Sequence, residues 1–365
     1  MAELTLGVEE EYQIIDPTTG HLTSRISDFL EKSDMKFPDQ IKPEFMQSQV
    51  EVGSNVCRDV TEVRSELVRL RSMVRDIAEE FGCRIIAAAT HPFSSWQEQL
   101  VTEGERYKML IDHMQIIAKR LLIFGMHIHV GIEDPEMRID IMNQMRYFMP
   151  HILALSTSSP FWMGENTGLK SYRSVIFEDL PRTGTPEHFN SASEFDLYID
   201  TLIRTGCIDE PTKIWWDIRP HPKFPTLEFR ICDCMTRVDD VVAVVALVQS
   251  LVAKLIKLRR KNQTWRVYRT GLINENKWRA LRHGIHGKLI DLGQKREVEF
   301  KTLVEEMLDF VDDVVDEVGT REALARIPLI LAEGTSADRQ LKTFEETGSL
   351  EAVIKMLADD TVLGF

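Results

Sequence analysis

Four short stretches of the sequence place acidic, amide, histidine or arginine side chains at every second position. They are Leu4–Ile14, Phe45–Val52, Gly125–Ile132 and Leu227–Cys232. Because alternate residues of a β-strand share a face, each stretch predicts a strand with one apolar and one polar face. The polar faces carry Glu9, Glu11, Gln13, Gln47, Gln49, Glu51, His127, His129, Glu228 and Arg230. If the strands are neighbours in a sheet, these side chains gather on one surface.

This combination of side chains suits divalent-metal chemistry. Clustered carboxylates repel one another and are tolerated at close range when a cation lies between them. Several carboxylates with one imidazole favour Mg²⁺ or Mn²⁺ over a softer metal. Arg230 among them indicates an anionic substrate group, most simply a phosphate. Glu44 lies seven residues before Glu51, the wrong parity for one flat strand, so it joins the group only if the chain bends.

The same residues admit two other interpretations. His-x-His binds zinc in barrel-type metal-dependent hydrolases, which would cleave amide bonds; here no alternating β/α pattern follows it, and the other histidines lack zinc-ligand spacing. A non-catalytic module with a structural metal is the second alternative, but it has no need of Arg230. The chain has no GxxxxGK[ST] and no GxGxxG, so a bound nucleotide would be held through metal ions.

The elements that position these residues read as an α+β fold. The simplest arrangement is a mostly antiparallel sheet with helices on its apolar face and an open groove on the polar face. Helical periodicity marks residues 63–77, 191–206 and 300–314, and the last third from about residue 238 reads as almost wholly helical. Residues 163–190 read as a long loop. No repeat or linker divides the chain, so we expect one domain over residues 1–365.

Composition excludes some partners and suggests a compartment. The formal net charge of −14 argues against nucleic acid or an anionic membrane as the main partner. The sequence starts with polar and acidic residues. It contains no uninterrupted apolar stretch of about 18 residues, so we expect no membrane span. Five cysteines without a CxxC pair fit a reducing compartment, so we expect a cytoplasmic protein. A homodimer is expected because such assemblies are the commonest.

Eight segments of the chain resemble the type 2 glutamate–cysteine ligase family, also called carboxylate–amine ligases. They are GVEEEYQI (7–14), PEFMQSQVEVGSNVC (43–57), ATHPF (89–93), GMHIHVGI (125–132), SSPFWMGENTGLKSYR (158–173), WWDIRPHPKFPTLEFRICD (215–233), ENKWRALRHG (275–284) and EGTSADRQ (333–340). Their common order, nearly from end to end, makes the resemblance specific. The departures are small: Ala89 stands where Gly is expected, Gly53 and Ser54 where Thr is usual, and Ser336 where Gly is common.

The resemblance implies a glutamine synthetase-like fold and a reaction. ATP and glutamate would give γ-glutamyl phosphate, which cysteine or another amine attacks, with Mg²⁺ or Mn²⁺ as cofactor. The implied metal ligands are Glu9, Glu11, Glu44, Glu51, His127 and Glu228. Arg230 would lie near the transferred phosphate, with Glu51 and Glu228 as further catalytic residues, and Tyr172, Arg173, Thr90 and His91 near nucleotide or substrate. His129, Asp233 and the segments 275–284 and 333–340 have no predicted role.

Overall fold

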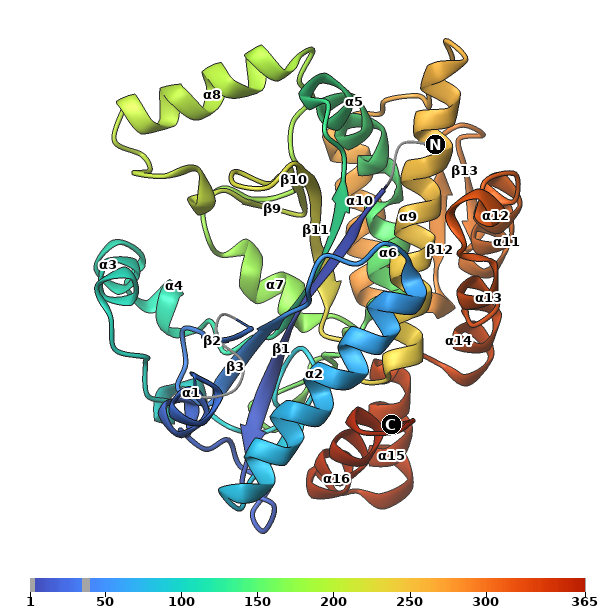
Figure 1. Ribbon diagram of the computed structural model, residues 1–365. Helices are drawn as coiled ribbons and strands as arrows, with labels where there is room; N and C mark the ends of the chain where they lie inside the picture. Colours follow the sequence, from blue (N-terminus) through green and yellow to red (C-terminus); the bar gives the residue numbers. More distant parts are fainter. Residues whose placement is uncertain (1–3, 35–39, 365) are drawn as a thin grey trace.

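The computed structural model describes residues 4–34 and 40–364 and contains one large antiparallel sheet. The strand order is β10-β11-β5-β1-β3-β2, and β4 also pairs with β1. The strands are β1 (Leu6–Ile15), β2 (Ile41–Pro43), β3 (Gln49–Gly53), β4 (Arg84–Ile86), β5 (Gly125–Gly131), β10 (Ile218–Pro220) and β11 (Thr226–Asp233). The three strands β11, β5 and β1 twist across the centre of the molecule (Figure 1). The predicted α+β fold with an antiparallel sheet is confirmed.

Helices surround the sheet and form the C-terminal third. They are α1 (Ile26–Asp34), α2 (Val60–Glu80), α3 (Glu105–Met114), α4 (Ile116–Lys119), α5 (Pro135–Met145), α6 (Met149–Ser156), α7 (Tyr172–Glu178), α8 (Ala192–Arg204), α9 (Val238–Arg260), α10 (Thr270–His283), α11 (Phe300–Val311), α12 (Val315–Val318), α13 (Arg321–Leu324), α14 (Ile327–Glu333), α15 (Ser336–Thr347) and α16 (Leu350–Thr361). The three helices predicted from periodicity are confirmed as α2, α8 and α11. Asp59 and Ser191 cap the first two, because their side chains accept backbone N–H groups of the first turn.

The apolar face of the sheet packs against α2, α5, α6 and α9. Val8, Ile128 and Phe229 from neighbouring strands share one core with Leu67 of α2 and Val245 of α9. The elements α3, α4, α7 and α8 lie on the other side of the sheet in Figure 1. Burial of the apolar face therefore fixes which side chains the polar face presents.

The long helix α9 is a core helix. Its 23 residues are apolar enough to cross a membrane by length and composition, but 83% of the most apolar window is buried inside the protein. The basic residues at its end, Lys257, Arg259 and Arg260, lie in the last turn. Cations are favourable at that end of a helix dipole.

Two sequence-based predictions of local structure are wrong, whereas the predicted helical C-terminal part is confirmed with one short interruption. Residues 45–52 are not one strand: β2 and β3 are antiparallel partners joined by a turn in which the Gln49 N–H donates to the Met46 carbonyl (3.0 Å). The predicted loop 163–190 contains the helix α7, which is too short for its sequence to show helical periodicity. A hairpin of β12 (Lys288–Asp291) and β13 (Arg296–Glu299) interrupts the helical C-terminal part, with Asp291 accepting the turn N–H groups of Gly293 and Gln294.

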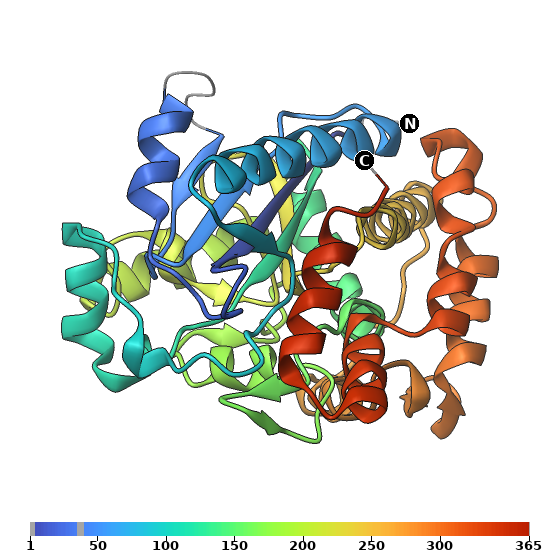
Figure 2. The ribbon, with the colours of Figure 1, turned by 90° about the horizontal axis from the view of Figure 1, so that it is seen from below.

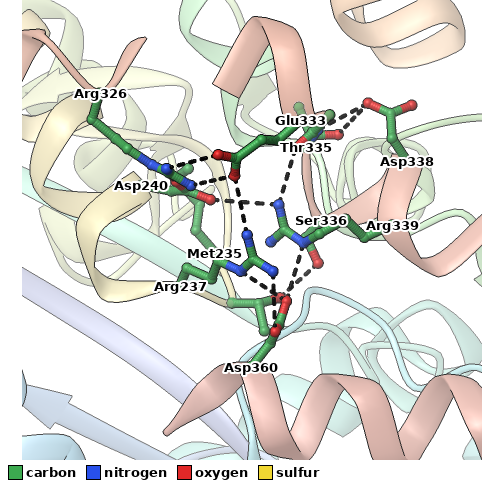
Figure 3. A network of polar contacts seen from close by, with 12 residues as sticks. Met235, Arg237, Asp240, Arg326, Glu333, Thr335, Ser336, Asp338, Arg339 and Asp360 are labelled. Atoms are coloured by element: carbon green, nitrogen blue, oxygen red, sulfur yellow. Dashed lines mark hydrogen bonds and ion pairs between the residues drawn. The ribbon is translucent and has the colours of Figure 1, made fainter. Parts of the chain in front are cut away.

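The C-terminal helices are tied to α9 by a network of six charged side chains, here called the C-terminal network (Figure 3). Its members are Arg237, Arg326 and Arg339 with Asp240, Glu333 and Asp360. Arg326 Nε lies 2.7 Å from Asp240 Oδ1, and Arg237 Nε lies 2.9 Å from Asp360 Oδ2. Figure 2 shows α15 and α16 packed together beside the sheet. Three cations and three anions therefore join four helices and the residue that precedes α9.

The segment 333–340 also supports the loop that leads toward the sheet face. Thr335 Oγ1 lies 2.9 Å from Thr157 Oγ1, and Gln340 Nε2 donates to the Ser158 carbonyl (2.7 Å). Both contacted residues are buried. The segment 333–340 had no role predicted from sequence. Its contacts with Thr157 and Ser158 are those of a support for this loop.

Candidate active site

The polar face of the sheet brings the predicted acidic residues together from four strands. Antiparallel pairing sets Glu9 opposite His127, Glu228 opposite His129, and Glu11 opposite Glu51. Two groups of potential metal ligands result, and the ligand atoms of each lie within 4.8 Å of one another. The upper cluster is Glu9, His129 and Glu228; the lower cluster is Glu11, Glu44 and Glu51. We keep these two names below.

Two histidines lie beside Glu9 of the upper cluster: His129, which belongs to the cluster, and His127, which adjoins it. His127 Nδ1 lies 3.1 Å from Glu9 Oε2, and His129 Nε2 lies 3.8 Å from the same oxygen. His129 Nδ1 is 3.1 Å from Thr226 Oγ1, whereas its buried Nε2 has no hydrogen-bond partner within residues 4–34 and 40–364. His127 was the predicted nitrogen ligand, and the structure adds His129, which sequence left without a role. His127 and His129 are two residues apart in GMHIHVGI and therefore share one face of the strand, a pattern that could have identified both as ligands.

The charges of the upper cluster are fixed by its neighbours. Burial acts to raise the pKa of Glu9, but the hydrogen bond with His127 and the nearby ring of His129 hold it well below its usual range. Burial opposes ionisation of Glu228 too, yet Arg230 and Arg219 keep the pKa of that carboxyl low. Burial, helped by Arg230, lowers the pKa of His127 to about 4, so the ring is neutral at neutral pH and can donate a lone pair.

The lower cluster is a set of carboxylates with little compensating charge. Glu44 enters it because the chain reverses between β2 and β3, which resolves its wrong parity. Burial, together with Glu51, raises the pKa of Glu11 to about 7. Burial, with Glu9 and Glu44, raises the pKa of Glu51 to about 8. Lys42 Nζ, at 3.5 Å from Glu51, is the nearest amine, so these acids repel one another in the absence of a cation.

Arginines flank the upper cluster on the β11 side. Arg230 pairs with Glu228 and also lies 3.5 Å from His127 Nδ1, at a bulge where β11 shifts register between Phe229 and Cys232. Arg219 of β10 donates from Nε to Glu228 Oε2 (2.7 Å). Arg219 could not be predicted from alternation because β10 is only three residues long. The hairpin register, which sets Arg219 opposite Glu228, is the signal that identifies it.

Arg173 lies beside the lower cluster at the start of α7. It is 4% exposed, and its Nη2 donates to the Arg230 carbonyl (3.2 Å). A Cβ atom at Gly125 would lie 2.6 Å from that Nη2, so a larger residue there would displace the guanidinium of Arg173. The Gly125 N–H in turn donates to Glu11 Oε2 (2.6 Å). Arg173 therefore supplies positive charge next to Glu11. The preceding residue, Tyr172, packs against Trp162, with ring centroids 5.7 Å apart.

Asp233 positions this arginine. Its buried carboxylate accepts from the Ser158 N–H (2.8 Å) and from the hydroxyls of Ser159 (2.7 Å) and Ser171 (2.8 Å). Ser159 Oγ then accepts the backbone N–H of Arg173 (3.1 Å). Asp233 is thus an anchor between the end of β11 and the segment 158–173, a role that sequence left open.

Thr90 and His91 have their main polar contacts inside the protein. The Thr90 hydroxyl donates to the Phe161 carbonyl (2.8 Å). His91 Nε2 lies 2.9 Å from the Gly20 carbonyl, and its Nδ1 accepts the Ser94 N–H (2.9 Å). Both side chains are buried, so they hold the 89–94 loop in place, and contact with a nucleotide stays a prediction.

Two cavities lie near the arginines. One, of about 700 Å³, is bounded by α5, α8 and the turn after β10, and Arg219, His221, Lys223 and Phe224 line it. His221 stacks on Phe224, with ring centroids 4.7 Å apart and planes at 12°, and also lies 5.3 Å from the His129 ring. The other, of about 420 Å³, follows α10 and is lined in part by Lys277 and Trp278.

The donor atoms on the sheet face fit divalent metal ions. The lower cluster offers carboxylate oxygens alone, which suit Mg²⁺ or Mn²⁺. The upper cluster adds an imidazole nitrogen that is buried and has no hydrogen bond among the described residues. An unpartnered buried acceptor costs free energy unless something binds it. The residues thus fit two metal positions side by side.

Comparison with known proteins identifies the family of the chain. The sequence profile of glutamate-cysteine ligase family 2 matches residues 5–356. Proteins of Chloroflexus aggregans and Herpetosiphon aurantiacus, each named "Putative glutamate--cysteine ligase 2", are 54% identical over 360 residues, which is 99% of this chain and 92% and 94% of theirs.

Two solved structures share the fold at 13% identity. They are the glutamate–cysteine ligase of Francisella tularensis in complex with AMP (TM-score 0.73, 98% of this chain and 88% of that one) and the bifunctional glutathione synthetase of Pasteurella multocida (TM-score 0.74, 98% and 52%). The chain thus spans about half the length of the bifunctional enzyme. This likeness concerns the fold, whereas the profile and the close relatives establish the family: the chain belongs to glutamate–cysteine ligase family 2.

Proposed function

We propose that the protein is an ATP-dependent carboxylate–amine ligase that joins the γ-carboxylate of glutamate to an amine, with cysteine as the candidate, through γ-glutamyl phosphate. The observation that carries the proposal is the pair of adjacent carboxylate clusters with two arginines at their edge. Phosphoryl transfer to a carboxylate brings two anions together, so it needs this concentration of positive charge.

The two clusters would hold the metal ions. Glu9, Glu228 and a histidine, His127 or His129, would form one site, and Glu11, Glu44 and Glu51 the other. Bound Mg²⁺ or Mn²⁺ neutralises phosphate and carboxylate charge and stabilises the leaving oxygen. The histidine rings suit this role because His127 is neutral and His129 Nε2 has no other partner among the residues described.

Arg230 would contact the transferred phosphoryl group. Its guanidinium is held by Glu228 and by the bulge in β11, so its direction is set before substrate binds. A preorganised donor stabilises charge that develops in the transition state without reorganisation at that moment. Arg219 would support the same role, because it holds the second oxygen of Glu228 at 2.7 Å.

The 700 Å³ cavity supports a place for the nucleoside part of ATP. It opens beside the upper cluster, since Arg219 and His221 line it and also contact Glu228 and the His129 ring. The His221 and Phe224 rings offer a flat apolar face for a base, and Lys223 and Arg138 offer positive charge. Glutamate would then lie at the lower cluster, near Arg173.

The hydrolase alternative fits the molecule less well. It rests on His-x-His in a parallel β/α barrel, whereas His127 and His129 lie in the middle of an antiparallel sheet. Five carboxylates also surround them, a donor set that favours hard cations over zinc.

Isotope transfer tests the proposal. Glutamate carrying labelled oxygen in its γ-carboxylate is incubated with ATP, Mg²⁺ and hydroxylamine. A γ-glutamyl phosphate intermediate predicts γ-hydroxamate formation and label in the released phosphate, because that oxygen leaves with the phosphoryl group. Contaminating ATPases would not transfer the label. ADP formation without label transfer, or amide cleavage without nucleotide, would favour the hydrolase alternative instead.

A further inference from the structure

The 420 Å³ cavity along α10 has no part in the reaction described so far. It is lined by Glu178, Thr183, Gly184, Thr185, Glu187, Thr270, Asn274, Lys277, Trp278 and Leu281. Thr270, Asn274 and Trp278 are spaced four residues apart, so they share one face of the helix. At 1.5 Å per residue the cavity follows α10 for about 12 Å between Thr270 and Trp278. This family segment, 275–284, had no role assigned from sequence.

One end of the cavity adjoins the strand that carries Arg230. Lys277 Nζ lies 2.7 Å from both carboxylate oxygens of Asp217, and the Asp217 carbonyl accepts the Arg230 N–H (2.8 Å). Glu178 ends α7, whose first turn holds Arg173 beside the lower cluster. The cavity is therefore attached to the reaction site through both β10 and α7. Asp217 precedes β10 and His221 follows it, so the two cavities lie at opposite ends of that strand.

The chemistry of this end suits a protonated amine. Lys277 is 4% exposed and is already paired with Asp217 and Glu178, so it is not available to an anionic ligand. The Glu178 side chain keeps 44% of its surface exposed, and Trp278, 51% exposed, presents an aromatic ring. A carboxylate and a ring face together bind an ammonium group.

The far end of the cavity suits oxygen acceptors. Arg146 is 1% exposed, and its Nη2 donates to Thr270 Oγ1 (2.7 Å). Its Nε and Nη1 have no hydrogen-bond partner within residues 4–34 and 40–364. Thr270 in turn donates to Glu187 (3.2 Å). A buried guanidinium bonded to a threonine that lines the cavity makes this end positive, which favours a carbonyl or carboxylate oxygen on the ligand.

We infer that this cavity is the subsite for the acceptor amine, with the ammonium group at Glu178 and a polar tail directed along α10 toward Thr270. The inference rests on the proposed ligase function. The amine nitrogen attacks the carbonyl carbon of the γ-glutamyl phosphate. The new C–N bond forms as the C–O bond to phosphate breaks. Of the two protons that the ammonium group loses, one passes to water and the other leaves with inorganic phosphate. A length of about 12 Å along α10 exceeds one amino acid, so the acceptor class is a primary amine of dipeptide size.

Hydroxylamine separates this subsite from the chemistry, because so small a nucleophile has no tail to bind. The variants are Glu178→Gln and Trp278→Ala, with Glu165→Gln, an exposed acid on β7 (Glu165–Asn166), as the matched control. We expect both variants to raise the KM of the amine at least tenfold while the rate of γ-hydroxamate formation and the KM of glutamate stay within twofold. The amine probes are cysteine and dipeptides with a free amino terminus, and dipeptides should give the higher kcat/KM.

Each outcome decides the inference. Unchanged KM values for every amine, or a hydroxamate rate that falls in parallel with amide formation, would show that the cavity has a structural role. A wild-type enzyme that prefers cysteine to every dipeptide would overturn the acceptor class. If wild-type protein forms no hydroxamate at all, the proposed ligase function fails first, and that result is distinct from any effect confined to the amine.

Discussion

Two groups of three carboxylates in this molecule have opposite surroundings. In the C-terminal network, Asp240, Glu333 and Asp360 meet three arginines, and Arg326 holds the pKa of Glu333 below its usual range (Figure 3). In the lower cluster, three glutamates have Lys42 at 3.5 Å from Glu51 and the positive charge of Arg173 near Glu11. Burial and mutual repulsion raise the pKa of Glu11 to about 7 and of Glu51 to about 8.

The difference separates structural charge from functional charge. A network with equal numbers of cations and anions is complete without a ligand, and its loss costs stability. A cluster of like charges lowers stability unless a cation binds, so it persists where its ligand has a function. Substitutions should therefore affect turnover at the lower cluster and stability in the C-terminal network.

The largest expected effect is the loss of turnover in Glu51→Gln. The substitution keeps the size of the side chain and removes one ligand charge, so we expect ADP release to fall on the order of 10³-fold, about 4 kcal/mol in transition-state stabilisation. The melting temperature should stay the same or rise, because one repelling charge is removed. Exposed Glu322→Gln is the control. Unchanged turnover in Glu51→Gln would contradict the metal assignment.

The complementary change, Asp240→Asn, should act on stability. Asp240 is 3% exposed and pairs with Arg326 at 2.7 Å and with Arg339 at 3.6 Å, so the variant removes the buried anion that these two arginines share. We expect the free energy of unfolding to fall by about 3 kcal/mol, measured by denaturant titration. Turnover per folded molecule should remain within twofold. A parallel loss of activity in fully folded protein would mean that the network has a part in the site.

Arg230→Lys tests the edge of the upper cluster. Lysine keeps the charge but loses the planar pair of donors, so it should not replace Arg230. We expect turnover to fall on the order of 10²-fold, as for the loss of one preorganised donor, with the KM of the amine unaltered. Kinetics like those of the wild type would assign Arg230 to a structural ion pair with Glu228.

Strand alternation predicted the parts of the site that depend on local pattern. Glu9, Glu11, His127 and Glu228 could be placed because a strand repeats every two residues, and one buried face fixes the other. Glu44 and Arg219 depend on which strands pair, and pairing is not a local property. Neither the turn after Glu44 nor the register that sets Arg219 opposite Glu228 leaves a periodic signal.

The resemblance to a family identified candidate residues but did not say where they lie in the structure. It marked Thr90 and His91 as well as Arg173, but only Arg173 lies beside the lower cluster. Asp233 and the segment 333–340 hold the 157–173 region through buried hydrogen bonds. Such support comes from residues far apart in sequence, so sequence reasoning had no means to distinguish it from ligand contact.

The smallest expected effect is on the pH dependence of stability with and without metal. It compares the lower cluster with the C-terminal network without any mutation. The folded protein raises the pKa of Glu11 to about 7 and of Glu51 to about 8, against 4.5 for an ordinary glutamate. Between pH 4.5 and about 8 the metal-free folded state therefore binds more protons than the unfolded state, so its stability falls as the pH rises.

Mg²⁺ should remove that slope, because the metal-bound acids carry no protons in the folded state. It competes with these protons, so its affinity rises over the same pH range, and at ten times its Kd it should add about 1.4 kcal/mol. Thermal unfolding with Mg²⁺ or with EDTA, from pH 5 to pH 9, measures both trends. In the C-terminal network, Arg326 holds the pKa of Glu333 below its usual range, so this acid contributes no falling slope. A metal-free protein whose stability rises with pH across this range would show that the lower cluster is already neutralised.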